Sequence, residues 1–172
     1  RELLEERGPS VFLFSNYLWS SAKNLEMSAL VKQWSPESIT IHGGPDTPKF
    51  EGDNEQYFRE NPHVDITVRT EGEVTTAEIL EHLPDDLLAG GDLSALADVP
   101  GLSFRHGDRV VRTPDRERLA DLDLLPSPYL TGLFDDFAHS TAPVVILETN
   151  RGCPYGCTFC DWGSATLSRI RK

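Results

Sequence analysis

Hydrophobic and polar positions along the chain form blocks that are typical of β-strands. Val11–Phe14 and Ile39–Ile41 are short apolar runs, and each is followed by polar or glycine residues. Val64–Val68 alternates between apolar and polar residues, as a half-buried strand does. We therefore predict that these segments form strands.

Helical segments separate the predicted strands. Asn24 is a suitable N-cap for a helix, which ends at Ser35-Pro36 because the residue before a proline avoids helical geometry. Further helices are predicted for residues 54–60, for residues 76–83 after a threonine cap, and for residues 92–97. The apolar positions at helical spacing in the first of these helices are Met27, Leu30, Val31 and Trp34.

A hairpin follows the alternating strands and helices. Residues 102–105 and 109–112 flank His106-Gly-Asp108, which is a typical hairpin turn sequence. Strands that alternate with helices at this spacing predict an α/β fold with a mostly parallel sheet and right-handed crossovers.

Three loops of the chain follow predicted strands: Ser15–Asn16, His42–Pro45 and Arg69–Glu73. In parallel sheets, ligands bind outside the carboxyl ends of the strands. Two of the three loops contain glycine, which allows the backbone to approach a ligand closely. These loops are therefore a candidate ligand-binding edge.

The chain changes character after residue 115. Residues 116–142 include Pro126-Ser-Pro128 and are predicted to be a linker. Residues 1–142 carry 12 basic and 26 acidic groups, whereas residues 143–172 carry four basic and two acidic groups. We therefore divide the chain into an α/β domain over residues 1–115, the linker, and the start of a second domain over residues 143–172.

Composition narrows the classes of function. The chain has 172 residues and a net charge of −12, which argues against nucleic acid as a partner because phosphate binding needs basic surface. No apolar run approaches the roughly 18 residues of a membrane span. Secreted disulfide-bonded proteins spread their cysteines along the chain, whereas the three cysteines here lie close together. We therefore expect a cytoplasmic protein.

The cysteines lie in a single loop. Cys153, Cys157 and Cys160 follow Val144–Leu147, an apolar run predicted to be a strand. Thiolates at this spacing can surround one iron–sulfur cluster, and three ligands for a four-iron cluster leave one iron open to a substrate. A zinc site completed by a distant histidine, or three unconnected thiols, are the alternatives.

The segment Arg151–Cys160 resembles the cluster motif of the radical S-adenosylmethionine (SAM) superfamily, C-x3-C-x-aromatic-C. The resemblance implies that Cys153, Cys157 and Cys160 hold a 4Fe–4S cluster whose open iron chelates SAM, with Phe159 beside the SAM adenine. In that superfamily the reduced cluster cleaves SAM to methionine and a 5′-deoxyadenosyl radical. The resemblance also implies an electron donor such as flavodoxin or ferredoxin.

The residues before the cysteine loop resemble the cobalamin-binding class of radical SAM enzymes. The order of the three loops matches the cofactor loops of that family's flavodoxin-like domain, and Pro126-Ser-Pro128 followed by Glu148–Gly152 matches its junction. The resemblance implies a flavodoxin-like domain that lacks its first strand, followed by the first strand and cluster loop of a truncated partial (βα) barrel. The residues it assigns to cobalamin are Ser15, Asn16, Gly43, Gly44, Pro45, Glu71 and Gly72.

From this resemblance we expect a fragment of a cobalamin-binding radical SAM enzyme. Relatives of this class often transfer a methyl group from SAM through methylcobalamin to a poorly activated atom, and others perform cyclisation or rearrangement. The substrate, a small molecule or a peptide, is not identified by the sequence. A non-enzymatic α/β protein with a zinc-binding or redox-active cysteine tail is the remaining alternative.

Overall fold

The computed structural model describes residues 2–83, 92–135, 151–152 and 158. It divides into two compact units, Arg1–Glu117 and Arg118–Lys172. The predicted strand Val144–Leu147 lies outside the described residues. Within the second unit, the described helical element is a short 3-10 helix, η3 (Leu122–Leu124).

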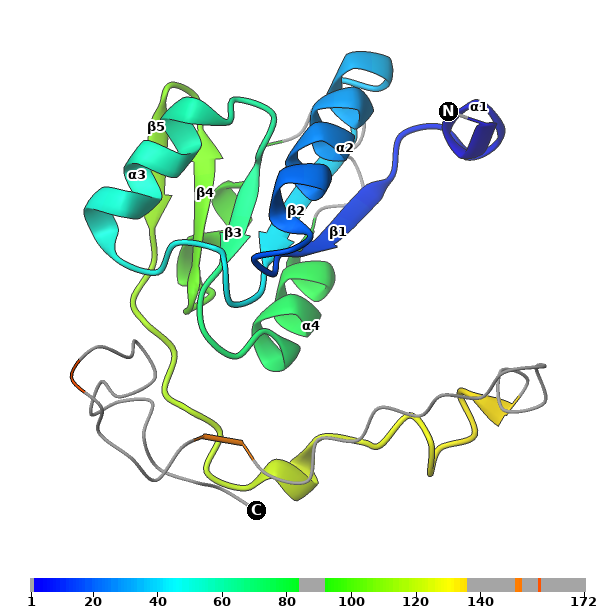
Figure 1. Cartoon of the computed structure of the whole chain (residues 1–172), viewed down its shortest axis with the longest axis vertical. Coiled ribbons are helices and arrows are strands. Elements are labelled where there is room, and N and C mark those ends of the chain that lie inside the picture. Colours follow the sequence, from blue (N-terminus) through cyan, green and yellow to red (C-terminus); the bar gives the residue numbers. More distant parts are fainter. Residues whose placement is uncertain (1, 84–91, 136–150, 153–157, 159–172) are drawn as a thin grey trace. The chain divides into compact units, whose positions relative to one another are not determined.

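A five-stranded sheet forms the centre of the first unit, and its strands lie side by side in chain order (Figure 1). The first three strands are parallel to one another, and the last two are each antiparallel to the strand before them. The strands are β1 (Val11–Ser15), β2 (Ile39–Gly43), β3 (Ile66–Val68), β4 (Leu102–His106) and β5 (Arg109–Arg112).

The sheet is therefore mixed, and the prediction of a mostly parallel sheet is wrong for its second half. The reason lies in the connection after β3. Pro100 returns to Thr75, whose hydroxyl donates to its carbonyl at 3.4 Å, so β4 begins at the edge where β3 ends and runs back along it. The predicted hairpin is confirmed, with Phe104 paired to Val111 and Gly107 at φ 58° in the turn.

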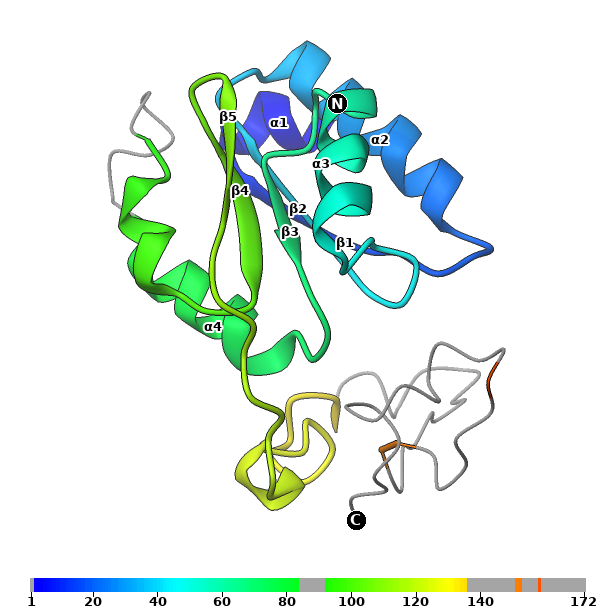
Figure 2. The same ribbon diagram turned by 90° about the vertical axis from the view of Figure 1, so that its left-hand side faces the viewer.

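Helices cover both faces of the sheet (Figure 2). The helices on one face are α2 (Ser21–Trp34) and α3 (Glu51–Glu60). The helices on the other face are α4 (Glu73–His82) and the 3-10 helix η2 (Ser94–Asp98). A short helix that the sequence analysis did not predict, α1 (Glu2–Arg7), precedes β1.

The two faces of the sheet differ in polarity because successive side chains of a strand point to opposite faces. On β2, Ile39 and Ile41 belong to an apolar core shared with Ile79 of α4. Their neighbours Thr40 and His42 are buried as well. The face under α2 and α3 therefore carries buried polar side chains. The apolar core consists of Ile39, Ile41, Ile66, Val68, Ile79, Leu93, Leu96, Val99, Leu102 and Phe104.

Helix α2 turns a different face to the sheet than its hydrophobic pattern predicts. Val31 is buried, but Met27 and Trp34 are 49% and 47% exposed. Buried in their place are Ser21 and Ser28. Small polar residues suit this position because the sheet surface beneath α2 and α3 is itself polar. The helix predicted from Asn24 also begins earlier, at Ser21.

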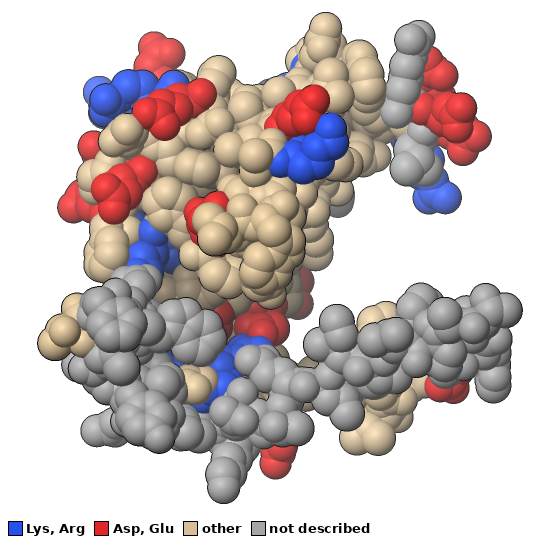
Figure 3. Space-filling view, in the orientation of Figure 1, with Lys and Arg blue, Asp and Glu red and all other residues tan. Residues whose placement is uncertain are grey.

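Acidic and basic side chains lie interspersed on the surface drawn in Figure 3, with a broad uncharged area between them. The described residues on that face form no continuous basic stripe. Among the described residues, no helix has the length and apolar character needed to cross a bilayer.

Candidate functional site

The first two predicted loops are joined by backbone hydrogen bonds at the carboxyl edge of the sheet. Ser15 and Gly43, the last residues of β1 and β2, are register partners. The amide of Asn16 donates to the carbonyl of Gly43 at 2.7 Å, and the amide of Asp46 donates back to the carbonyl of Asn16 at 3.0 Å. The two loops therefore form one continuous surface.

The third loop lies beside the second. Gly43 and Gly72 both pack near Val68, the last residue of β3, since a Cβ added at either glycine would lie 3.6 Å from the Val68 side chain. Glu71 and Gly72 are half-buried. The structure thus brings all three predicted loops together at one edge, as the strand order dictates.

Gly44 is the point of closest approach between the first two loops. Its φ is +94°, in the region that favours glycine, and a Cβ added there would lie 2.6 Å from the backbone oxygen of Asn16. Any side chain at this position would force the two loops apart. The predicted glycine therefore serves the contact between loops.

The side chain of Asn16 is fully buried, and its amide is used by the protein itself. Its Nδ2 lies within hydrogen-bond distance of His42 Nδ1 (3.1 Å), Thr47 Oγ1 (3.2 Å) and the Tyr57 hydroxyl (3.2 Å). Its Oδ1 accepts from Asn24 Nδ2 at 2.9 Å. This side chain therefore links the two loops to α2 and α3. A ligand at this edge would contact the residues next to Asn16 in its loop and not the Asn16 side chain.

His42 lies beneath this contact, stacked on Phe14 with ring centroids 4.7 Å apart. The Asn16 amide nitrogen is only a donor, so His42 Nδ1 accepts and Nε2 carries the proton. Nε2 is buried and has no hydrogen-bond partner among the described residues. Burial, and secondarily His63, lowers the pKa of His42 from 6.5 to about 4. The imidazole is therefore neutral at physiological pH.

An exposed apolar surface follows β1, which the sequence analysis did not single out. Leu18 and Trp19 are 85% and 81% exposed, and the Trp19 ring stacks on that of Tyr17 with centroids 4.9 Å apart. The Ser20 hydroxyl, which accepts from the Tyr17 amide at 3.1 Å and donates to the Ser15 carbonyl at 3.2 Å, braces this turn. The signal in the sequence is an aromatic–leucine–aromatic run, Tyr17–Trp19, just after the first predicted strand.

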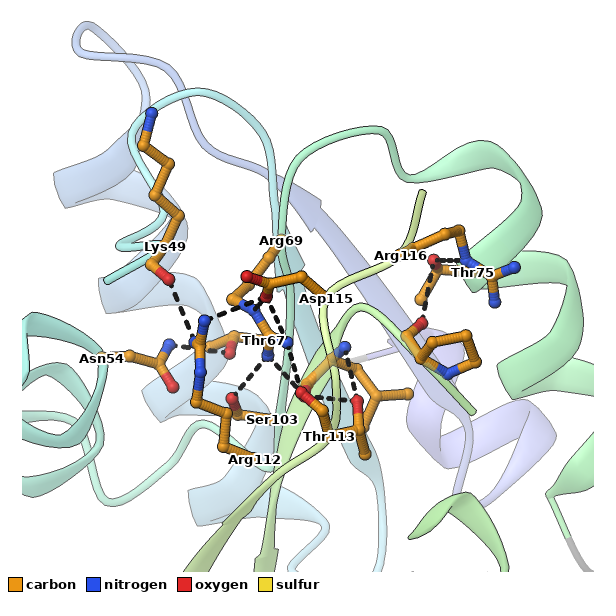
Figure 4. Close-up of polar contacts among 12 residues, drawn as sticks. Lys49, Asn54, Thr67, Arg69, Thr75, Ser103, Arg112, Thr113, Asp115 and Arg116 are labelled. Carbon is orange, nitrogen blue, oxygen red and sulfur yellow. Dashed lines mark hydrogen bonds and ion pairs between the residues drawn. The ribbon is translucent and has the colours of Figure 1, made fainter. Parts of the chain in front are cut away.

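Arg69, at the start of the third loop, is buried at 1% exposure. The sequence analysis assigned it no role of its own. Figure 4 shows its guanidinium among polar groups of β4 and of the segment that follows β5. The next residue, Thr70, has a φ of 61°, which is uncommon for a β-branched residue.

The predicted cluster ligands Cys153, Cys157 and Cys160, and the predicted SAM contact Phe159, lie outside the described residues. Near them the structure describes Gly152, at φ 107°, and the exposed Thr158. Within the described part of the chain, no three His, Cys, Asp or Glu side chains gather in a way that could hold a metal ion.

Comparison with known proteins supports the resemblance noted from the motifs. A scan against models of protein families finds no match. The cobalamin-dependent radical SAM methyltransferase TokK of Streptomyces tokunonensis is 38% identical over 169 residues, which is 95% of this chain and 24% of that protein. Over nearly its whole length, the chain is similar to cobalamin-dependent radical SAM methyltransferases. It spans about a quarter of the length of the curated relatives that it matches.

Other relatives differ in the reaction that they are named for. The 2-(S-pantetheinyl)-carbapenam-3-carboxylate methyltransferase of Streptantibioticus cattleyicolor is also 38% identical, over 95% of this chain and 23% of that protein. The anaerobic magnesium-protoporphyrin IX monomethyl ester cyclase of Synechocystis is 24% identical over 78% of this chain and 25% of that protein. This relative of the radical SAM methyltransferases is thus also similar to cyclases.

The contact at Gly44 gives a stability prediction. Gly44→Ala should lower the free energy of unfolding by at least about 2 kcal/mol, because the new Cβ meets the Asn16 backbone and φ is left-handed. The matched control is Gly52→Ala, which should be neutral or stabilising by roughly 0.5–1 kcal/mol, since this glycine lies in α3 with open space around it. Urea unfolding measures both, and equal stabilities would contradict the loop contact.

Burial of His42 gives a pH prediction. Its folded-state pKa of about 4 lies below the 6.5 of the unfolded chain, so the unfolded state binds the proton first and stability falls as the pH drops from 6.5 towards 4. Between pH 7 and pH 5 this one group should remove about 2 kcal/mol of unfolding free energy. His42→Asn keeps an acceptor for Asn16 and should flatten the dependence by that amount. Urea unfolding at the two pH values measures this. The prediction would be contradicted if the unfolding free energy of His42→Asn changed between pH 7 and pH 5 by as much as that of the wild-type chain.

Proposed function

We propose that this chain carries the cobalamin-binding edge and the cluster-binding cysteines of a radical SAM enzyme, and that the whole protein transfers a methyl group. The observation that supports cobalamin binding most directly is the meeting of three loops at one sheet edge, next to an exposed aromatic surface. The similarity to two methyltransferases over nearly the whole chain supports the reaction.

The residues at the edge suit a broad ring system with polar side groups. Trp19 and Leu18 present apolar surface that the protein itself leaves uncovered, and ligand sites combine such surface with a few polar groups. The loops that contain Ser15, Pro45 and Glu71 meet at the same edge of the sheet. The fixed positions of these loops mean that little ordering is left to occur on binding.

The cysteine loop is proposed to hold a 4Fe–4S cluster through Cys153, Cys157 and Cys160. The three thiolates leave one iron free of protein ligands, and Phe159 is proposed to lie beside the SAM adenine. When bound, the cluster supplies the electron that cleaves SAM. A flavodoxin or ferredoxin is the proposed donor, and the proposed site of action is the cytoplasm.

Cyclisation is the second candidate for the reaction, because three of the relatives are named as magnesium-protoporphyrin monomethyl ester cyclases. These relatives are 24% to 30% identical to this chain, compared with 38% for the two methyltransferases. The higher identity favours methyl transfer. Incubating the whole protein with isotopically labelled SAM separates the two, because a methyltransferase alone places the labelled methyl group in the product.

Cobalamin binding is tested by titrating the full chain with hydroxocobalamin and following its visible spectrum. Trp19→Ala should weaken binding roughly tenfold, because a large exposed aromatic surface is lost. The matched control is Trp34→Ala, since Trp34 is also exposed, at 47%, but ends α2, at the opposite edge of the sheet. Equal affinities of the two variants for cobalamin would show that Trp19 does not contact the ligand. An unchanged corrin spectrum with the wild-type chain would refute cobalamin binding.

Cluster binding is tested by anaerobic reconstitution with iron and sulfide. The wild-type chain should take up about four irons, and Cys157→Ala should lose the cluster because two thiolates hold it poorly. Thr158→Ala is the matched control, since this exposed neighbour offers no thiolate. One tightly bound zinc in place of iron would favour the non-enzymatic alternative, an α/β protein with a zinc-binding tail.

A further inference from the structure

The buried Arg69 lies where the third loop of the candidate site begins, and its bonds lead away from that loop. Its Nη1 donates to the Ser103 hydroxyl at 2.9 Å and to the carbonyl of Leu102, both on β4. Its Nη2 donates to the carbonyl of Thr113 at 2.7 Å, and its Nε donates to Asp115 Oδ1 at 3.0 Å. The guanidinium therefore binds the loop to β4 and to the segment Thr113–Arg116.

The same segment also holds the far side of the loop. Arg116 donates from Nε to the Thr75 hydroxyl at 2.7 Å (Figure 4). It also forms an ion pair with Glu78, and both partners lie in α4. Helix α4 begins at Glu73, directly after the loop. The two flanks of the loop, Arg69 before it and Thr75 after it, are therefore bonded to one short segment of chain.

Backbone hydrogen bonds make the arrangement continuous. The Arg69 amide donates to the carbonyl of Gly101 at 2.8 Å, and the Gly101 amide donates to the carbonyl of Pro114 at 2.7 Å. Gly101 adopts φ +89°, and a Cβ there would lie 3.1 Å from Cβ of Arg116. A side chain at this position would be strained and would press on Thr75 and Arg116, so glycine allows the loop's anchor and the segment to lie this close.

Burial of a guanidinium is unfavourable unless its donors are paired. Arg69 meets this condition through two carbonyls, a hydroxyl and the exposed carboxylate of Asp115, which also pairs with Arg112. A lysine would bring a single ammonium in place of the planar fork. It would leave acceptors on β4 or on the segment without a donor.

We propose that Arg69 is a positioning residue that makes the loop Thr70–Gly72 and the segment Thr113–Arg116 move as one unit. The left-handed backbone of Thr70 persists because both flanks of the loop are held. This inference rests on the proposed function in one respect: a cobalamin bound at the loop also steadies the segment that leaves the sheet. Arg69 itself is buried and does not touch the ligand.

Hydrogen exchange of the full chain tests the coupling without any ligand. In Arg69→Lys, exchange should be about tenfold faster both at the start of the loop and in the segment, and both should change together. The amide of residue 69, which is bonded to Gly101, reports on the loop, and the amide of Thr113, which is bonded to Leu102, reports on the segment. Asp115→Asn removes only the charge of an exposed partner, so the fold is kept, and it should accelerate both segments to a smaller extent. Faster exchange in one segment alone would overturn the proposal.

Arg105→Lys is the matched control. Arg105 is a partly buried arginine whose Nε donates to the carbonyl of Val64 at 2.7 Å and whose Nη2 donates to that of Asn61 at 3.1 Å, at the opposite end of β3. This variant should lower the melting temperature as Arg69→Lys does, and it should leave exchange in both segments unchanged. Equal acceleration by the two variants would reduce Arg69 to a general stability role.

Addition of hydroxocobalamin separates this inference from the proposed function. With the wild-type chain, the ligand should slow exchange at Thr113–Arg116, and Arg69→Lys should lose this protection and bind about tenfold more weakly. If the wild-type chain leaves the corrin spectrum unchanged, the proposed function fails, and the ligand-free exchange still decides the coupling. If the chain binds cobalamin and Arg69→Lys shows the same protection, the inference fails and the proposed function stands.

Discussion

The side-chain amide of Asn16 is the contact on which the carboxyl edge of the sheet depends. Burying an amide is costly unless its hydrogen bonds are made inside the protein, and here partners come from α2, β2, the following loop and α3. The two hydrogens of Nδ2 are shared among three neighbours and Oδ1 accepts from the fourth, so this one amide links all four elements. Gly44 permits this geometry, since its missing side chain leaves room for the Asn16 backbone.

The two faces of the sheet differ in polarity. Thr40, His42 and Thr67 are fully buried on the face that carries α2 and α3, whereas the opposite face holds the apolar core. Helix α2 packs on this polar face with Ser21 and Ser28 buried, and Met27 and Trp34 are left half-exposed. The larger apolar cluster lies on one face, and the polar contacts that hold the loops lie on the other.

The candidate site combines rigidity with exposed apolar surface. Hydrogen bonds of Asn16 hold its first two loops, and those of Arg69 hold the third. Leu18 and Trp19, which follow β1 at this edge, remain exposed. A site of this kind is largely formed before its ligand arrives. The relatives that share this region are named for methyl transfer or for cyclisation, which is consistent with a common binding edge that serves different reactions.

The sequence by itself determined the alternation of strands and helices, the hairpin, the three loops and the cysteine motif, because these depend on local periodicity and spacing. It predicted neither the antiparallel course of β4 nor the exposure of Met27, since both follow from where the chain folds back and from what the opposite face offers. Adjacent residues of α4 show the same limit: Ile79 is fully buried and Leu80 is 48% exposed, although both are apolar. The roles of Asn16 and Arg69 were likewise decided only by tertiary structure, because their partners lie up to 46 residues away in the chain. Local sequence also does not show which polar side chains are buried, and only a buried side chain must find its hydrogen-bond partners within the protein and not in water.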